Sequence, residues 1–327
     1  MTTQTAIATA TPTTITEKTA WLEARYWRFG MEDELDDQLR DLFVIDDEGD
    51  MTDRPRIDPL TGETGGLMVL GRSGDGKTAL LKRMLRVNPV LTEMTDKQEG
   101  NTLYITVPPD ATIKKLAELI LARTGYHRVD SRLRSSDAWE MVMHRLALVG
   151  IGTVIIDECH HIFRPGPGRE VPGAIQSLKH IMQSAGGVAM ILAGVPGLRD
   201  AILSEESGET FRRFDEFYLN DIERDSDEAS DFSKNVKYSA EFLGLTIPDG
   251  SALAERILMA RNGQIGLSVQ LAKKIMADAI TCKRTELTLS RAEAVYRKSS
   301  RCIGMTPFDA APWESVQKEL RAIGWGQ

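Results

Sequence analysis

The segment GRSGDGKT, residues 71–78, constrains the fold more than any other part of the sequence. It follows the apolar run Leu67–Leu70 and precedes a helical pattern over Lys77–Val87. The segment fits the pattern G-x-x-x-x-G-K-[ST], in which glycines let backbone N–H groups face phosphates at the positive N-terminus of a helix. A strand, this loop and a helix together predict a nucleotide-binding unit built on a parallel sheet.

The loop also predicts which groups would contact ATP and Mg²⁺. Lys77 would reach the β- and γ-phosphates, and the Thr78 hydroxyl would ligate Mg²⁺. A chance glycine-rich turn is the alternative, but the strand before the loop and the helix after it favour the nucleotide site. The residues expected to bind the nucleotide are Gly71, Arg72, Ser73, Gly74, Asp75, Gly76, Lys77, Thr78 and Ala79.

A second motif, TVIIDECHH at residues 153–161, places two carboxylates at the end of an apolar strand. The carboxyl ends of parallel strands face the ligand in nucleotide-binding sheets. We therefore expect Asp157 to hold Mg²⁺, directly or through water, and Glu158 to orient and deprotonate the attacking water. Two solvated acids at the end of an ordinary strand are the alternative, which the preceding phosphate loop disfavours.

Cys159, His160 and His161 follow these carboxylates and raise the question of a metal site. Ligands at successive positions cannot easily converge on one ion, and the sequence has no second cluster of Cys or His nearby. We expect these residues to pack behind the sheet or to relay the nucleotide state.

A third segment, ETFRRFDEFYLN at residues 209–220, has two arginines before a short strand. In an oligomer, Arg212 or Arg213 could reach the γ-phosphate bound by a neighbouring subunit, which would make hydrolysis depend on assembly. The alternative is a solvated pair, or salt bridges to Glu209 and Asp215. The spacing alone does not decide between the two.

The composition is that of a globular chain. Of the 327 residues, 42% are hydrophobic and 27% are charged, and no apolar run approaches the roughly 20 residues of a membrane helix. The net charge of −8 excludes a uniformly basic surface, although residues 251–327 hold more Lys and Arg than Asp and Glu. Three scattered cysteines do not form a disulfide framework. The Thr- and Ala-rich start lacks signal-peptide features and predicts a cytoplasmic protein with a disordered leader.

The pattern of apolar residues divides the chain into segments. Short apolar strands alternate with helices, which predicts an α/β fold with a parallel sheet covered by helices on both faces. Helical periodicity then predicts a small all-helical lid domain. It also predicts a last apolar helix that docks on the chain itself, on a neighbouring protomer or on a partner. The expected segments are a disordered leader at 1–19, a helical segment and loop at 20–65, the α/β nucleotide-binding domain at 66–221, the lid at 222–304 and the tail at 305–327.

The motifs resemble those of AAA+ ATPases. The glutamate after the Mg²⁺ aspartate, the alternating strands and helices, the paired arginines and the helical lid carry this resemblance. Within that group, about residues 20–300 resemble the TniB/TnsC-like transposition ATPases, which are related to the Mu-phage B protein and, distantly, to Orc/Cdc6 initiators. The segments that carry the resemblance are GLMVLGRSGDGKTALLKRML, TVIIDECHHIF, ILAGVPGLRDAI and FRRFDEFYLND.

The resemblance implies a five-stranded AAA+ module with a helical lid, acting as a regulator rather than as the DNA-cutting enzyme. Such proteins bind ATP with Mg²⁺ and assemble as rings or helical filaments on duplex DNA without sequence preference. They recruit a transposase, and a target-selection factor places some of them. By position, the matches are Gly71, Gly76, Lys77 and Thr78 with Walker A, Asp157 and Glu158 with Walker B, and Arg212 or Arg213 with the arginine finger.

Two positions depart from the AAA+ pattern. The strand Val188–Leu192 is followed by Ala193-Gly194, where these ATPases commonly have a polar sensor residue. In the lid, only Arg261 lies near the place of the usual sensor arginine. Both departures predict weak hydrolysis that depends on assembly or on a partner.

The surface that would bind DNA gives the weakest pattern. Lys114 and Lys115 begin the helix after the second strand and are the favoured phosphate contacts, with a solvated helix face as the alternative. Two other functions stay open, a signalling ATPase that binds no DNA and a replication-initiator or helicase-loader ATPase. Assembly on random-sequence duplex and the kind of recruited partner, transposase or helicase, would separate them.

Overall fold

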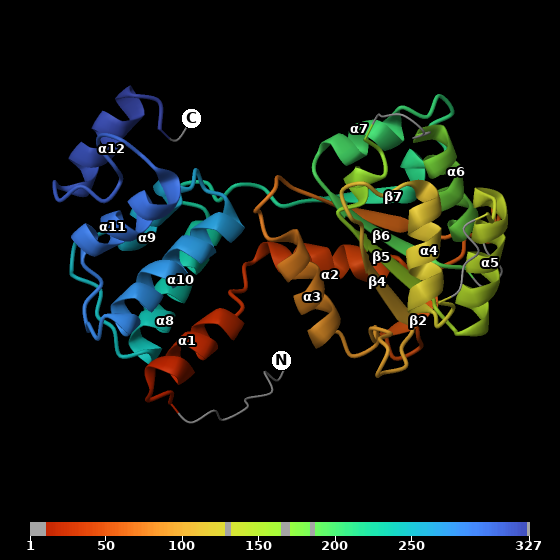
Figure 1. Ribbon diagram of the computed structural model, residues 1–327, viewed down its shortest axis with the longest axis horizontal. Coiled ribbons are helices and arrows are strands. Elements are labelled where there is room, and N and C mark those ends of the chain that lie inside the picture. Colours follow the sequence, from red (N-terminus) through yellow and green to blue (C-terminus); the bar gives the residue numbers. More distant parts are fainter. Residues whose placement is uncertain (1–10, 128–131, 165–170, 184–186, 326–327) are drawn as a thin grey trace. The chain divides into compact units, whose positions relative to one another are not determined.

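The computed structural model describes residues 11–127, 132–164, 171–183 and 187–325. The chain forms two compact units, each drawn in Figure 1. One unit is continuous, residues 33–219, and contains the main sheet; the other combines the residues up to 32 with those from 220 onward and is helical. Among the described helices, none has the length and apolar character needed to cross a membrane.

The main sheet confirms the predicted parallel architecture. Its strand order is β4-β5-β6-β3-β7, so β6 lies between the strand that precedes the phosphate loop and the strand that ends at Asp157. All neighbouring strands are parallel, and their carboxyl ends therefore lie along one edge of the sheet. The strands are β3 (Gly66–Leu70), β4 (Thr102–Thr106), β5 (Thr153–Asp157), β6 (Ala189–Gly194) and β7 (Phe214–Tyr218).

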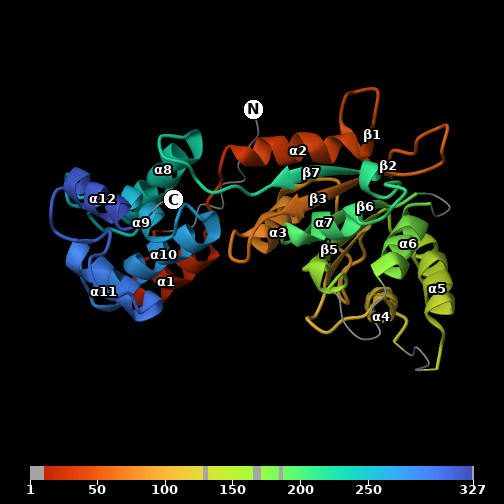
Figure 2. The same ribbon diagram turned by 90° about the horizontal axis from the view of Figure 1, so that it is seen from above.

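Helices cover both faces of this sheet, as Figure 2 shows. On one face, Met68 and Ile156 from the strands share a core with Leu116, Trp139 and Leu178 from three helices. The strands are buried along nearly their whole length, which explains their continuous apolar runs. The helices of this unit are α2 (Met31–Asp41), α3 (Lys77–Val87), α4 (Ile113–Arg123), α5 (Ser135–Leu148), α6 (Val171–Met182) and α7 (Gly197–Leu203), with the 3₁₀ turns η1 (Cys159–His161) and η2 (Phe211–Arg213).

A small hairpin lies where the sequence was interpreted as a helical end and a loop. Strands β1 (Phe43–Ile45) and β2 (Met51–Pro55) pair antiparallel before the main sheet. The Asp46 carboxylate accepts a 2.8 Å hydrogen bond from the backbone N–H of Asp50, and Gly49 has a φ of 86°. Asp and Gly close the turn because the first bonds backbone N–H groups and the second tolerates positive φ.

Helix α1 (Ile15–Ala24) begins inside the segment predicted as a disordered leader. The Thr14 hydroxyl accepts a hydrogen bond from the backbone N–H of Glu17 at 3.2 Å, and the Glu17 carboxylate accepts one from the backbone N–H of Thr14 at 3.1 Å. This reciprocal capping explains why the helix starts here. The prediction of disorder is therefore wrong for residues 14–19, and residues 1–10 lie outside the described part of the chain.

In the helical unit, the N-terminal helix α1 packs against helices from the last third of the chain. Trp21 in α1 stacks on Phe242 at a ring distance of 4.4 Å, and the Lys273 ammonium donates to the backbone carbonyl of Arg25 at 2.5 Å. These contacts join the N-terminal helix to helices made more than 200 positions later. The other helices of the unit are α8 (Asp227–Phe242), α9 (Leu253–Ala260), α10 (Ile265–Thr281), α11 (Leu289–Ser300) and α12 (Trp313–Ala322).

A buried arginine in α9 holds the C-terminal tail. The Arg256 side chain is 1% exposed, and its guanidinium donates to the backbone carbonyls of Pro307, Asp309 and Ala311 at 2.5 to 2.9 Å. It also lies over the Trp313 ring, 4.9 Å from the centroid. Burial lowers the pKa of Arg256, but a guanidinium stays charged in proteins. One buried cation thus binds the carbonyls of three alternate residues in the segment that leads into α12.

The tail helix docks on its own unit at two of its apolar positions. Val316 and Leu320 are fully buried, whereas Ile323 is 65% exposed. Phe308, just before the helix, is buried against Tyr296 at a ring distance of 5.6 Å. Of the roles considered for the tail, the structure favours docking on the chain itself, and residues 326–327 lie outside the described part.

We expect Arg256→Met to destabilise the helical unit by about 3 kcal/mol or more, because it leaves several buried carbonyls without a donor. The exposed Arg321 in α12 provides the control, and Arg321→Met should change stability by less than about 0.5 kcal/mol. Urea unfolding and limited proteolysis of the tail measure both effects. Equal unfolding midpoints for the two variants would contradict the assigned role of Arg256.

Candidate functional site

The phosphate loop runs from the carboxyl end of β3 into the first turn of α3. Gly74 and Gly76 have φ values of 92° and 102°, a region that residues with a Cβ atom rarely adopt. The Asp75 carboxylate, 3% exposed, folds back and accepts a short hydrogen bond from the backbone N–H of Arg72. The glycine conformations and this hydrogen bond hold the loop in a closed turn at the N-terminus of the helix. Backbone N–H groups there can bind an anion.

Lys77 is buried within this turn at 5% exposure. Its ammonium donates to the backbone carbonyls of Gly71 and Arg72 at 2.7 and 2.9 Å. Burial lowers the pKa of Lys77, and the nearby carboxylates of Glu158, Asp75 and Asp157 act in the opposite direction. The ammonium therefore lies at the centre of the loop with neutral acceptors that phosphate oxygens could replace.

The predicted metal ligands lie together at the end of β5. The Thr78 hydroxyl donates to the Asp157 carboxylate at 2.7 Å, joining positions that are 79 residues apart. Tyr104 in β4 donates to the same carboxylate oxygen at 2.7 Å, and Asp157 is fully buried. Burial and this hydrogen bond raise the pKa of Tyr104, which keeps the phenol a donor. The sequence analysis missed Tyr104, which lies between Leu103 and Ile105 in β4.

Glu158 follows directly in a strained backbone conformation with a φ of 55°. Its backbone N–H donates to the Asp157 carboxylate at 2.9 Å, and its carbonyl accepts from the N–H of His161 at 3.0 Å. The Oε2 atom of Glu158 lies 3.3 Å from Nδ1 of His160. The side-chain ligand atoms of Glu158, His160 and His161 lie within 4.8 Å of one another, but the Arg164 guanidinium at 3.2 Å from His160 Nε2 opposes a cation there.

These residues fit a nucleotide with Mg²⁺. The hydroxyl of Thr78 and the carboxylate of Asp157 are the oxygen ligands that Mg²⁺ prefers, and they already converge on one point. The backbone of residues 71–76 and the Lys77 ammonium lie beside that point, where phosphates would bind. The Glu158 carboxylate lies at the same edge of the sheet. Its side chain is 38% exposed and is therefore open to water.

The two arginines lie elsewhere. They precede β7, whose first residue pairs in register with the first residue of β3, whereas the phosphate loop follows the last residue of β3. Arg212 and Arg213 are therefore at the opposite edge of the sheet from Lys77. The Arg213 side chain is 5% exposed and forms an ion pair with Glu63, and its pKa is lowered mainly by burial. Arg212 is exposed.

Lys114 and Lys115 lie in the first turn of α4, whose N-cap is Thr112. The Lys115 ammonium forms an exposed ion pair with Glu118 at 3.1 Å. Because α4 follows the carboxyl end of β4, this turn lies on the same side of the sheet as the phosphate loop. Neither lysine takes part in the cluster around Asp157.

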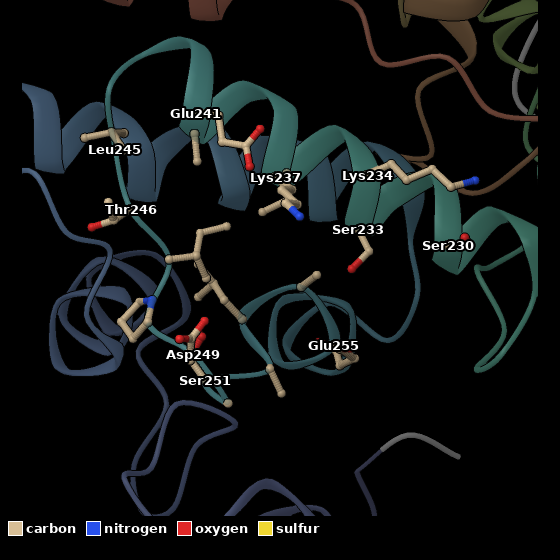
Figure 3. Close-up of a pocket in the computed structure, with 18 residues that line it drawn as sticks. Ser230, Ser233, Lys234, Lys237, Glu241, Leu245, Thr246, Asp249, Ser251 and Glu255 are labelled. Atoms are coloured by element: carbon tan, nitrogen blue, oxygen red, sulfur yellow. The ribbon is translucent and has the colours of Figure 1, made fainter.

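A groove of about 660 Å³ lies in the helical unit, between α8 and the loop that leads into α9. Figure 3 shows Lys237 and Glu241 on α8 facing Asp249 across it. The lining combines two lysines with three carboxylates over an apolar floor. Such a mixed lining does not match a phosphate site.

Comparison with known proteins identifies the family. Residues 49–224, more than half of the chain, match the family model described as bacterial TniB protein. The chain belongs to the TniB family. The matched range of this TniB chain includes the phosphate loop, the β5 carboxylates and both arginines. No curated protein matches the sequence.

Solved structures show that the TniB chain has an AAA+ fold of the Orc/Cdc6 type. Cdc6p from Pyrobaculum aerophilum has a TM-score of 0.61 at 14% identity, covering 88% of this chain and 72% of its own. Aeropyrum pernix ORC1 in complex with DNA has a TM-score of 0.56 at 16% identity, covering 86% and 69%. Aeropyrum pernix ORC2 has a TM-score of 0.52 at 16% identity; the match covers 74% of this chain and only 63% of ORC2. These structural similarities show the fold alone, and the fold agrees with the one predicted from the sequence.

Proposed function

We propose that this chain is an ATP-dependent regulator of transposition that assembles on target duplex DNA and recruits a transposase to it. The contact between Thr78 and Asp157 beside the phosphate loop carries the nucleotide part of this proposal. Membership of the TniB family, together with a fold shared with an ORC1 protein solved in complex with DNA, supports the DNA part. A target-selection factor is the partner that would direct such an assembly.

In the proposed reaction, ATP is hydrolysed to ADP and phosphate. Lys77 and the loop backbone would bind the phosphates, and Thr78 and Asp157 would hold Mg²⁺, whose positive charge would stabilise the transferred phosphoryl group. Glu158 orients the attacking water and accepts its proton. Ala193-Gly194 at the end of β6 offers no polar side chain, which supports slow hydrolysis in the isolated protein.

The positions of the arginines support hydrolysis across a subunit interface. Arg212 lies at the opposite edge of the sheet from the phosphate loop, so it would reach only the nucleotide of a neighbouring chain. Arg213 is already paired with Glu63, which also accepts a 2.9 Å hydrogen bond from the Gln183 amide. We therefore assign Arg212 as the arginine finger and Arg213 as a structural residue.

We expect Arg212→Ala to keep ATP binding and to lose the increase in hydrolysis with protein concentration or DNA, a loss of up to about 10³-fold in the stimulated rate. Arg213→Ala should instead destabilise the sheet unit by about 2 kcal/mol, because it leaves Glu63 without its cation. Steady-state hydrolysis against protein concentration and thermal unfolding measure the two effects. Hydrolysis that does not depend on concentration in any of the three proteins would refute a finger acting between subunits.

DNA binding is expected to depend on ATP and salt but hardly on base sequence, because phosphate contacts release counterions without reading bases. Lys114→Ala combined with Lys115→Ala should weaken binding to all duplexes and reduce the slope of log K against log salt by about 2. The exposed pair Lys283→Ala with Arg284→Ala is the matched control. If only the control variant binds DNA more weakly, the contact surface lies in the helical unit rather than at α4.

Electron microscopy with ATP, Mg²⁺ and random-sequence duplex DNA tests the proposal directly. Rings or helical filaments that require both ATP and DNA are expected. No binding to DNA would favour a signalling ATPase instead, and monomers on DNA would contradict the proposed assembly. The Orc/Cdc6 type of fold supports a second candidate, a replication-initiator or helicase-loader ATPase. Recruitment of a replicative helicase rather than a transposase by the assembled protein would select that candidate.

A further inference from the structure

The turn after β5 places a buried histidine beside Glu158. The His160 side chain is 9% exposed, and its Nδ1 atom lies 3.3 Å from Oε2 of Glu158. This Nδ1 atom is buried and makes no well-aligned hydrogen bond. The Glu158 carboxylate is therefore the nearest charged acceptor for a buried polar atom, and a small rotation of either side chain would complete the bond.

The neighbour on the other side of the ring fixes where the proton lies. The Arg164 guanidinium is 3.2 Å from Nε2 of His160. A guanidinium only donates hydrogen bonds, so Nε2 must accept and a neutral ring must carry its hydrogen on Nδ1. Burial, aided by the positive charges of His161, Arg164 and Lys77, lowers the pKa of His160 to about 4. The neutral ring thus carries its one hydrogen on Nδ1, the nitrogen that lies 3.3 Å from Oε2 of Glu158.

The end of strand β6 lies against His160. The strand lies between β3 and β5, and its last residue, Gly194, pairs with Leu70 at the start of the phosphate loop. A Cβ atom at Gly194 would lie 3.4 Å from the Cβ of His160 and 3.0 Å from the Leu198 side chain. The position between the two catalytic strands therefore has no polar side chain of its own, and His160 packs against it.

We infer that His160 is the positioning residue for Glu158, holding its carboxylate by a hydrogen bond from Nδ1 in a place where β6 contributes no polar group. The backbone of Glu158 is already held by bonds to Asp157 and His161, so the side-chain torsions are what remain to be fixed. This inference rests on the proposed role of Glu158 in hydrolysis and adds a residue that the motif match does not assign.

Two substitutions of similar polarity separate positioning from packing. In His160→Asn the amide nitrogen lies near the place of Nδ1 and can still donate to Glu158; in His160→Gln the amide lies near the place of Nε2 and can meet only Arg164. Hydrolysis with duplex DNA and Mg²⁺ should keep its kcat within about threefold in His160→Asn and fall about tenfold or more in His160→Gln. Binding of a fluorescent ATP analogue should be unchanged in both.

The double variant His160→Gln with Glu158→Gln should be no slower than Glu158→Gln alone, because the histidine acts through the glutamate. Equal kcat for the Asn and Gln variants, or multiplied losses in the double variant, would overturn the inference while Glu158 kept its role. A wild-type rate in Glu158→Gln would overturn both.

Should His160→Gln fail to fold, the exposed Arg164 gives the same test without a change in the core. Arg164→Met removes the donor to Nε2, so the ring no longer has its hydrogen fixed on Nδ1. The kcat should fall by about two- to fivefold with unchanged nucleotide binding. An unchanged kcat would overturn the inference.

Discussion

Glu158→Gln is expected to bind ATP as tightly as the wild type and to hydrolyse it about 10²- to 10⁴-fold more slowly, because the amide cannot accept the proton of the attacking water. The carboxylate lies at the edge where Thr78 and Asp157 converge, and its side chain is open to water. Since hydrolysis would release the assembly, this variant should also give complexes on duplex DNA that last longer. Steady-state kinetics and dissociation from immobilised DNA measure the two effects.

The exposed Glu140 in α5 provides the control for this prediction. Glu140→Gln makes the same chemical change in the same unit and should leave hydrolysis within about twofold of the wild type. If Glu158→Gln hydrolyses ATP as fast as Glu140→Gln does, the glutamate is not the base, and the assignment of the β5 motif is wrong.

Lys77→Ala is expected to weaken ATP binding by about 100-fold or more and, with it, to prevent assembly on DNA. The Lys77 ammonium is buried near the carboxylates of Asp75, Asp157 and Glu158. It lies inside the loop that would hold the phosphates. Loss of the cation leaves this edge of the sheet negative, which repels a triphosphate. Titration with a fluorescent ATP analogue measures the affinity.

Lys97→Ala, at an exposed loop position of the same unit, is the matched control and should bind the analogue normally. Thermal unfolding must accompany the titration, since Lys77 also donates to two loop carbonyls. A folded Lys77→Ala protein with near-normal affinity would mean that the loop does not bind nucleotide through this lysine.

The parts of the site that depend on short-range pattern could be predicted from the sequence. The glycine spacing, the strand before the loop and the helix over Lys77–Val87 all lie within about 20 residues, and α3 has these bounds in the structure. Asp157 and Glu158 could be placed because they come at the end of a buried strand. In a parallel sheet, all strands have their carboxyl ends at the same edge, where the ligand binds.

Other features depend on contacts that no local pattern records. Tyr104 reaches Asp157 only because β4 and β5 are neighbours in register. The proposal that Arg213 is not the finger rests on its ion pair with Glu63, which lies 150 positions away. The role of Arg256 could not be predicted, because it depends on the return of residues 307–311 to α9. Each of these contacts follows from the fold rather than from spacing along the chain.

The helical unit is built from two segments that are made at different times during translation. The sheet unit is one continuous stretch, residues 33–219, and all of its strands are synthesised before α8. Helix α1 is made before the sheet unit, yet its partners Phe242 and Lys273 come more than 200 residues later. Domains generally fold as units during translation, starting from the N-terminal side. The nucleotide unit can therefore fold early, while α1 waits with Trp21 uncovered until the last third of the chain emerges. Chaperone capture of nascent chains should accordingly concentrate on the N-terminal helix.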